Sequence, residues 1–167
     1  MCSSDLKRDG TVVRDHLTHP YLAGHGYACA RVDMRGSGES DGLMWDEYLK
    51  QEQDDALEVI DWLAHQPWCT GRVGMMGISW GGFNALQVAA RRPPALRAII
   101  TIDSTVDRFA DDIHYKGGCL LLENLGWSST MQSFSSRPPD PALVGARWRD
   151  MWIVRLKNEP LLLEPYE

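Results

Sequence analysis

The chain has 167 residues, of which 44% are hydrophobic and 24% are charged, and its net charge is −6. These values are typical of a globular domain with its own core, and the acidic balance argues against a general nucleic-acid-binding protein. The sequence has no apolar run long enough to span a membrane and no signal-peptide pattern in its first ten residues, so we expect a cytoplasmic protein with no membrane partner.

Helical and strand-like segments alternate from the beginning of the chain. Residues 12–23 have helical spacing, and the short apolar run at 27–33 stops at a glycine-rich loop and therefore predicts a strand. Residues 46–66 predict a strong helix, because their apolar positions fall on one face and two acids occupy the first turn. Pro67 ends this helix.

The next three segments repeat this order. Residues 72–77 predict a strand, residues 81–91 predict a helix of small and apolar side chains, and residues 96–102 predict a strand that is apolar on both faces. Strands of this kind, joined by helices, indicate a mostly parallel sheet with right-handed crossovers. The predicted fold class is therefore α/β.

The pattern changes after Asp103, and no further strand is evident up to the last residue. Residues 116–132 and 140–158 predict helices, and the second begins at Asp140-Pro141, an acid at the capping position followed by proline at the first helical position. We therefore expect residues 1–103 to form a partial core and residues 104–167 to form a helical cap segment.

One motif carries chemistry. Gly77-Ile78-Ser79-Trp80-Gly81 fits the pattern G-x-S-x-G and lies between a predicted strand and a predicted helix, as the nucleophile turn of a serine hydrolase requires. Such a turn exposes the serine hydroxyl above the sheet, and the glycines on either side avoid clashes there. Ser79 is thus the predicted nucleophile, and the backbone N–H of Trp80 is the predicted oxyanion donor.

A second glycine-rich segment, residues 33–40, follows the predicted strand at 27–33. We interpret Asp33 and Arg35 as side chains that brace this loop. The loop is acidic and has no P-loop lysine, so nucleotide binding is rejected. The four cysteines are scattered without zinc-like spacing, and we predict neither a metal nor a cofactor.

These motifs together resemble the CocE/NonD-type hydrolases, a group of cocaine-esterase-like and X-Pro dipeptidyl-peptidase-like serine hydrolases. The matching segments are residues 7–11, 19–20, 26–27, 31–38, 51–55 and 74–82. The resemblance implies an α/β-hydrolase fold with a helical cap, and hydrolysis of small esters or amides through an acyl-serine. It also implies that Ser79 is the nucleophile and that Trp80 supplies an oxyanion N–H.

The chain departs from this family in three ways. The family's second oxyanion donor is a tyrosine hydroxyl, but the corresponding positions here are Ser4, Asp5 and Leu6. The strand expected before them is absent as well. The resemblance places the catalytic Asp and His after the cap, beyond the last residue given. We therefore expect a truncated piece that keeps the nucleophile and lacks the acid and the base.

Two other interpretations remain open. A compact active esterase could use Asp103 and His114, which follow Ser79 in the chain order Ser, Asp, His. The chain could instead be a non-catalytic binding module built on the same sheet. The sequence indicates neither an oligomeric state nor a preference for esters over amides.

Overall fold

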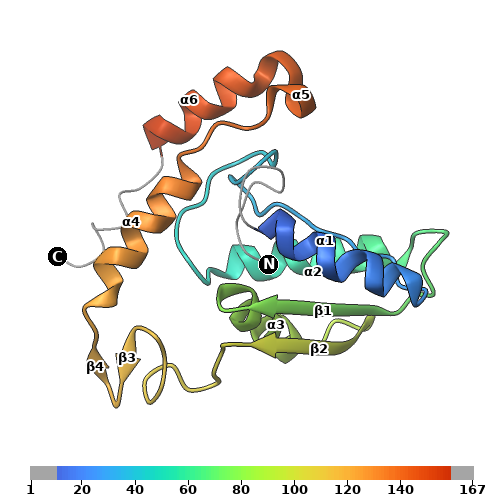
Figure 1. Cartoon of the computed structure of the whole chain (residues 1–167), viewed down its shortest axis with the longest axis horizontal. Coiled ribbons are helices and arrows are strands. Elements are labelled where there is room, and N and C mark those ends of the chain that lie inside the picture. Colours follow the sequence, from blue (N-terminus) through green and yellow to red (C-terminus); the bar gives the residue numbers. More distant parts are fainter. Residues whose placement is uncertain (1–10, 159–167) are drawn as a thin grey trace. The chain divides into compact units, whose positions relative to one another are not determined.

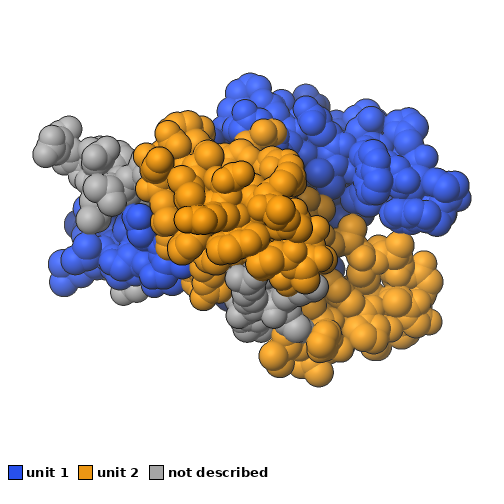
Figure 2. All heavy atoms as spheres, turned by 90° about the horizontal axis from the view of Figure 1, so that it is seen from above, with its two compact units in different colours: residues 1–2, 46–133, 161–167 blue, residues 3–45, 134–160 orange. Residues whose placement is uncertain are grey.

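The computed structural model describes residues 11–158, and Figure 1 shows their helices and strands. The chain divides into two compact units (Figure 2). One unit contains residues 46–133. The other contains, among the described residues, 11–45 and 134–158. Within the described ranges no helix is long and apolar enough to cross a lipid bilayer.

The unit of residues 46–133 is built around a parallel strand pair. Strand β1 (Val73–Ile78) pairs with β2 (Leu96–Ile102), and helix α3 (Trp80–Ala90) connects them. Helix α2 (Lys50–Ala64) packs against α3 and β1. The buried core joins the three layers and consists of Ala56, Ile60, Met75, Ala85 and Val88. The structure thus confirms the predicted partial α/β fold, and β1 and β2 begin and end within one residue of the prediction.

Two predicted helices of this unit begin later than expected. Helix α2 begins at Lys50 and not at residue 46, because Tyr48 has a positive φ of 61° that cannot belong to a helix. The helix predicted at 116–132 is replaced at its start by a hairpin of β3 (Tyr115–Lys116) and β4 (Cys119–Leu120). Gly117 and Gly118 both have positive φ and form the turn, so helix α4 (Glu123–Ser135) starts only after it.

The other unit contains α1 (Thr11–Gly24), as predicted. The structure shows no strand at 27–33, where one was predicted. A strand needs a neighbour to satisfy its backbone N–H and C=O groups, and no described segment of this unit pairs with these residues. The apolar run therefore continues as irregular chain, and residues 27–30 are exposed.

The end of this unit also differs from the prediction. Asp140 caps a helix as expected, since its Oδ1 accepts the N–H of Ala142 at 2.8 Å. The predicted single helix of 140–158 is interrupted at Gly145, whose φ is 62°. It is observed as α5 (Pro141–Val144), a 3₁₀ turn η1 (Gly145–Arg147) and α6 (Trp148–Asn158). The proposed boundary between core and cap at residues 103/104 stays a prediction.

Candidate active site

Ser79 occupies a sharp turn between β1 and α3. Its backbone has φ 54° and ψ −119°, a conformation that costs a residue with a side chain on the order of 1–3 kcal/mol. The neighbouring chain holds this conformation in place: the N–H of Ser79 donates to the carbonyl of Ile102 at 2.9 Å, and the Ser79 carbonyl accepts the N–H of Phe83 at 3.0 Å. The turn therefore has the strained strand-to-helix geometry that the sequence motif predicts.

The flanking glycines are required by close backbone contacts. A Cβ atom at Gly77 would overlap the backbone of Gly81, and one at Gly82 would meet the Ile102 carbonyl and the side chain of Ser104. Both glycines are buried. Their absence of a side chain lets α3 begin directly against the ends of β1 and β2, which positions Ser79 at the carboxyl ends of the strands.

Trp80 is the first residue of α3, and its side chain is 2% exposed. Because the helix begins here, the backbone N–H of Trp80 has no carbonyl within the helix to which it can donate. Its indole Nε1 donates to Glu52 Oε2 at 2.9 Å. The start of a helix, with free N–H groups and the positive end of the dipole, is suited to stabilise a negative charge that develops on a bound substrate.

Aromatic side chains pack around this turn. The Tyr48 ring lies 5.8 Å from that of Trp80 and 5.6 Å from that of Phe83. The guanidinium of Arg108 covers the rings of Tyr48 and Phe83 at 4.2 and 4.3 Å and pairs with Asp112 at 2.5 Å. Burial is the largest cause of the raised pKa of the Tyr48 hydroxyl. These residues form an aromatic wall beside the turn, and the Arg108–Asp112 ion pair covers it.

The half-buried acid Glu47 directly precedes Tyr48 in the chain. Burial raises the pKa of Glu47 to about 6, against the lowering effect of a hydrogen bond that its Oε1 accepts from the indole N–H of Trp127. The Trp127 ring lies 6.2 Å from that of His114, which is 9% exposed. A half-buried carboxyl with a pKa near neutrality is a common feature of functional sites.

The predicted site residues are not all brought together. Asp103 directly follows β2, has a positive φ of 53° and is exposed. His114 is buried, and its Nδ1 has no hydrogen-bond partner. Across the described residues, no hydrogen bond links Ser79, Asp103 and His114. The roles of Asp103 and His114 as acid and base stay predictions.

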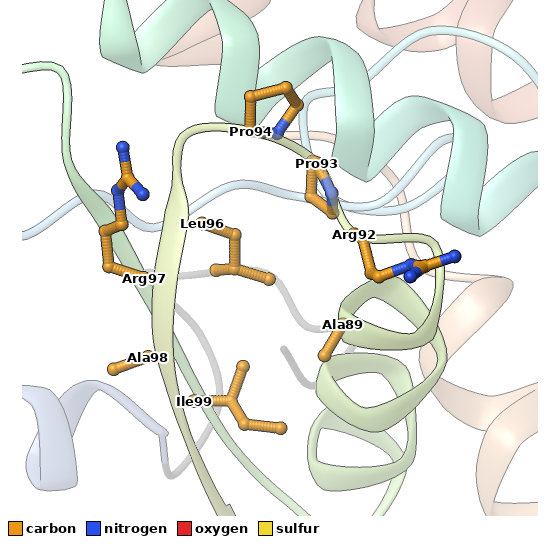
Figure 3. A pocket seen from close by; sticks show the side chains of 8 residues that line it. All are labelled: Ala89, Arg92, Pro93, Pro94, Leu96, Arg97, Ala98 and Ile99. Atoms are coloured by element: carbon orange, nitrogen blue, oxygen red, sulfur yellow. The ribbon is translucent and has the colours of Figure 1, made fainter.

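The hollow drawn in Figure 3 is a separate feature. It has a volume of about 510 Å³ and is lined by residues 89, 92–94 and 96–99. These residues come from the end of α3 and the start of β2, whereas Ser79 lies where β1 ends, so in this parallel pair the hollow belongs to the opposite edge of the sheet. We do not assign it to the candidate active site. Within residues 11–158, no group of three or more His, Cys, Asp or Glu side chains is arranged to hold a metal.

Sequence reasoning missed the residues around the turn that come from α2, from the segment just before α2 and from the loop after β2. Glu52, Tyr48 and Arg108 contact Trp80 or Phe83 from positions about 25 to 32 residues away in the chain. Only Glu52 had a detectable signal, because an acid in the first turn of a helix is a capping pattern. The others depend on tertiary contacts that a local pattern does not indicate.

The sequence was compared with those of known protein families. The family model of X-Pro dipeptidyl-peptidase (S15 family) matches residues 4–166. The chain belongs to this family. Its members and homologues are hydrolases, which agrees with the Ser79 turn and with the resemblance inferred from the sequence.

Individual relatives of this S15-family chain agree. It is 32% identical to the cocaine esterase of Rhodococcus sp. over an alignment of 126 residues. The alignment covers 70% of this chain and 21% of that protein. It is 40% identical over 93 residues to a Mycobacterium bovis protein named as a candidate serine esterase, covering 56% of this chain and 15% of that protein. The chain thus spans about a fifth or less of these relatives.

Solved structures show the same fold. A CocE/NonD family hydrolase from Staphylococcus aureus matches with a TM-score of 0.52 and 28% identity. The match covers 62% of this chain and 18% of that protein. The likeness supports a partial α/β-hydrolase fold for the S15-family chain described here.

Proposed function

We propose that this chain is the nucleophile-bearing part of a serine hydrolase that cleaves small esters or amides. The observation that carries the proposal is the strained backbone of Ser79 between β1 and α3, with φ 54°. A binding module has no need to keep a serine in such a conformation, whereas a nucleophile must project its hydroxyl to a substrate. Membership of the S15 family supports the same reaction class.

The reaction would proceed through an acyl-serine. A general base takes the proton of the Ser79 hydroxyl while the oxygen attacks the substrate carbonyl, and the carbonyl oxygen becomes an oxyanion. The backbone N–H of Trp80 donates to this oxyanion, and loss of such a donor costs about 3 kcal/mol of transition-state stabilisation. The leaving alcohol or amine takes up the proton, and water then cleaves the acyl-serine to release the acid.

The proposed reaction needs a general base beside the Ser79 hydroxyl, and no described side chain is hydrogen-bonded to that hydroxyl. Within residues 11–158 no side-chain hydrogen bond of Ser79 is observed, to His114 or to any other residue. We propose that the acid and the base belong to a longer protein, in keeping with relatives several times the length of this chain. Cocaine esterase and X-Pro dipeptidyl-peptidase are named for ester and peptide substrates, and we propose small substrates of that class for this chain. We also propose a cytoplasmic location without a nucleic-acid or membrane partner, as expected from the sequence and its net charge of −6.

The test uses a fluorophosphonate probe on the purified chain. We expect slow labelling confined to Ser79, because triads without their base keep a residual acceleration of about 10³–10⁴ over water. Ser79→Ala should abolish the labelling, and the matched variant Ser129→Ala, at an exposed serine of α4, should leave it unchanged. Labelling spread over several serines, or unchanged in Ser79→Ala, would contradict the proposal.

The same assay separates this proposal from a compact esterase. His114→Ala should leave both the labelling rate and p-nitrophenyl acetate hydrolysis unchanged if the base lies elsewhere. A drop of a hundredfold or more would identify His114 as the base, since general-base catalysis contributes about 10²–10⁴ in rate. Fast turnover by the wild-type chain would show that a base is present within it.

A further inference from the structure

The start of α3 is tied to α2 by a single carboxyl oxygen. Glu52 Oε2 accepts the indole N–H of Trp80 at 2.9 Å and the side-chain N–H of Asn84 at 3.0 Å. Because residues 80 and 84 are four apart, they lie on the same face of α3 in successive turns. Trp80 is 2% and Asn84 is 7% exposed, so both bonds are shielded from water.

We propose that Glu52 is a positioning residue that fixes the first turn of α3 and, through the Trp80 indole, the backbone N–H that faces the oxyanion. This inference rests on the proposed function, because the position of that N–H affects chemistry only if Ser79 is acylated. Glu52 touches neither the serine nor the carbonyl that the serine would attack. It acts through Trp80.

Backbone contacts hold the first turn of α3 against β1 and β2, and the side-chain hydrogen bonds to Glu52 add to them. Gly81 and Gly82 have no side chain, and among the described residues the hydrogen bonds to Glu52 are the side-chain bonds that fix residues 80–84. An oxyanion donor must stay within about half an ångström of its working position, and a displacement of about 1 Å can cost roughly a hundredfold in rate. A buried charge-assisted bond to the residue that carries the donor meets this demand.

The surroundings of Glu52 make its bonds sensitive to pH. Burial raises the pKa of its carboxyl, and hydrogen bonding by the Trp80 and Asn84 side chains and by the Tyr48 and Leu49 backbone partly opposes this effect. Helix α3 and strand β1, which pack against α2, have no ionisable side chain. The carboxyl's own segment carries the ionisable side chains of Glu47, Lys50, Asp54 and Asp55, and of these Glu47 interacts electrostatically with Glu52 and with Arg108.

Two buried oxygens suggest the most informative replacement. Glu52 Oε1 and Asn84 Oδ1 both lack a hydrogen-bond partner, although their side chains are already bonded to each other through Oε2 and Nδ2. A glutamine at position 52 can keep its oxygen as the acceptor for both donors and offer its NH₂ group to the Asn84 oxygen. Glu52→Gln should therefore preserve the bonds to α3, whereas Glu52→Ala removes them.

The first readout is the indole resonance of Trp80 in a ¹H–¹⁵N spectrum of the full chain, assigned with Trp80→Phe. In the wild type, the resonance should shift during an acid titration as Glu52 takes up a proton. In Glu52→Gln the resonance should stay downfield at every pH, because the bond persists and nothing titrates. The control variant Glu58→Gln, at an exposed acid of α2, should titrate like the wild type. A wild-type resonance that ignores pH would overturn the proposal.

The second readout is the rate of fluorophosphonate labelling at Ser79. We expect Glu52→Ala to slow labelling by at least about tenfold and Glu52→Gln to recover it to within about threefold, with far-UV circular dichroism showing that each variant is folded. If Glu52→Ala does not fold, Glu52→Asp replaces it, because the shorter side chain withdraws the carboxyl from Trp80. If a folded variant that lacks the Glu52–Trp80 hydrogen bond reacts at the wild-type rate, the positioning role of Glu52 is refuted, but the proposed function is not. A wild-type chain that does not react at Ser79 would refute the proposed function, and this inference with it.

Discussion

Two glycine-rich turns of this molecule are built on different principles. The turn at residues 77–82 begins in a paired strand, and its glycines lie against the backbone of α3 and β2 and the side chain of Ser104. The loop at residues 33–42 follows an extended segment without a strand partner in the described chain. Two of its three glycines lie against charged side chains: Gly38 meets the Asp33 carboxyl, and Gly42 meets Arg35.

The difference shows what holds each turn in its conformation. The Ser79 turn is fixed by the sheet and helix that it connects, so its strain is borne by packed secondary structure. The other loop is held by side-chain hydrogen bonds: the Asp33 carboxylate accepts the N–H of Glu39 at 3.1 Å, and Arg155 of α6 donates to the carbonyls of Gly38 and Ser40 at 2.9 and 2.8 Å. We therefore expect the first turn to be damaged by replacing a glycine with a larger residue. We expect the second to be damaged by removing a side chain that donates or accepts hydrogen bonds.

The largest effect is expected for Gly77→Ala. The added methyl group would overlap the backbone of Gly81, which cannot move without shifting α3 away from β1. We expect the free energy of unfolding, measured by urea denaturation, to fall by about 3 kcal/mol, at the upper end for overpacking.

Gly74→Ala is the matched control in the same strand. A Cβ atom at Gly74 would meet only the Ala98 carbonyl at 3.7 Å, an ordinary contact. This variant should stay within about 0.5 kcal/mol of the wild type. Equal losses in the two variants would mean that the close approach of α3 to β1 is not what requires glycine at position 77.

Arg155→Ala is expected to have the next largest effect. The guanidinium is 2% exposed and donates to three backbone carbonyls, those of Gly38, Ser40 and Arg137. Its removal leaves these acceptors without that donor and should cost about 2–3 kcal/mol, since hydrogen bonds from a charged group contribute about 1.5–3 kcal/mol. Hydrogen exchange should show faster amide exchange within residues 36–41.

Arg149→Ala provides the comparison, because Arg149 is an exposed arginine of the same helix. It should change stability by less than about 0.5 kcal/mol and leave exchange in the loop unchanged. If the amides of residues 36–41 stay protected from hydrogen exchange in Arg155→Ala, the loop is held by its own internal hydrogen bonds.

The same contrast explains how much the sequence could predict. The turn at Ser79 was predicted correctly because its requirements are local: a strand, two glycines at fixed spacing and a helix of small residues. The strand at 27–33 was wrong because a strand exists only with a partner, and an apolar run does not reveal whether that partner is there. The hairpin at Gly117-Gly118 had a local signal, paired glycines, that helical spacing in the surrounding residues obscured.

The neighbours of Ser79 could not be predicted in the same way. Glu52 and Arg108 reach the start of α3 through contacts between α2, the loop after β2 and α3, and nothing in the residues next to them indicates which partner they meet. Tyr48 was placed inside a predicted helix because its positive φ, an uncommon backbone state for an aromatic residue, leaves no trace in hydrophobic periodicity.

The smallest expected effect is a gain in stability, and it tests the strain at Ser79 directly. In Ser79→Gly the backbone can adopt φ 54° without a Cβ penalty, whereas Ser79→Ala keeps the penalty and loses the hydroxyl. Both variants remove the hydroxyl that we propose as the nucleophile, and both should be unlabelled by a fluorophosphonate. We expect the glycine variant to be more stable than the alanine variant by about 1 kcal/mol in urea denaturation.

With the same pair of substitutions at Ser129, the alanine variant should be the more stable of the two. Ser129 lies within α4, where glycine is less favourable than alanine by about 1 kcal/mol because it loses more backbone freedom on folding. A stabilising glycine at 79 beside a destabilising one at 129 would show that the chain gives up stability to hold its serine in this turn. If alanine is at least as stable as glycine at both positions, no strain is stored at Ser79, and the strongest structural argument for a nucleophile there is lost.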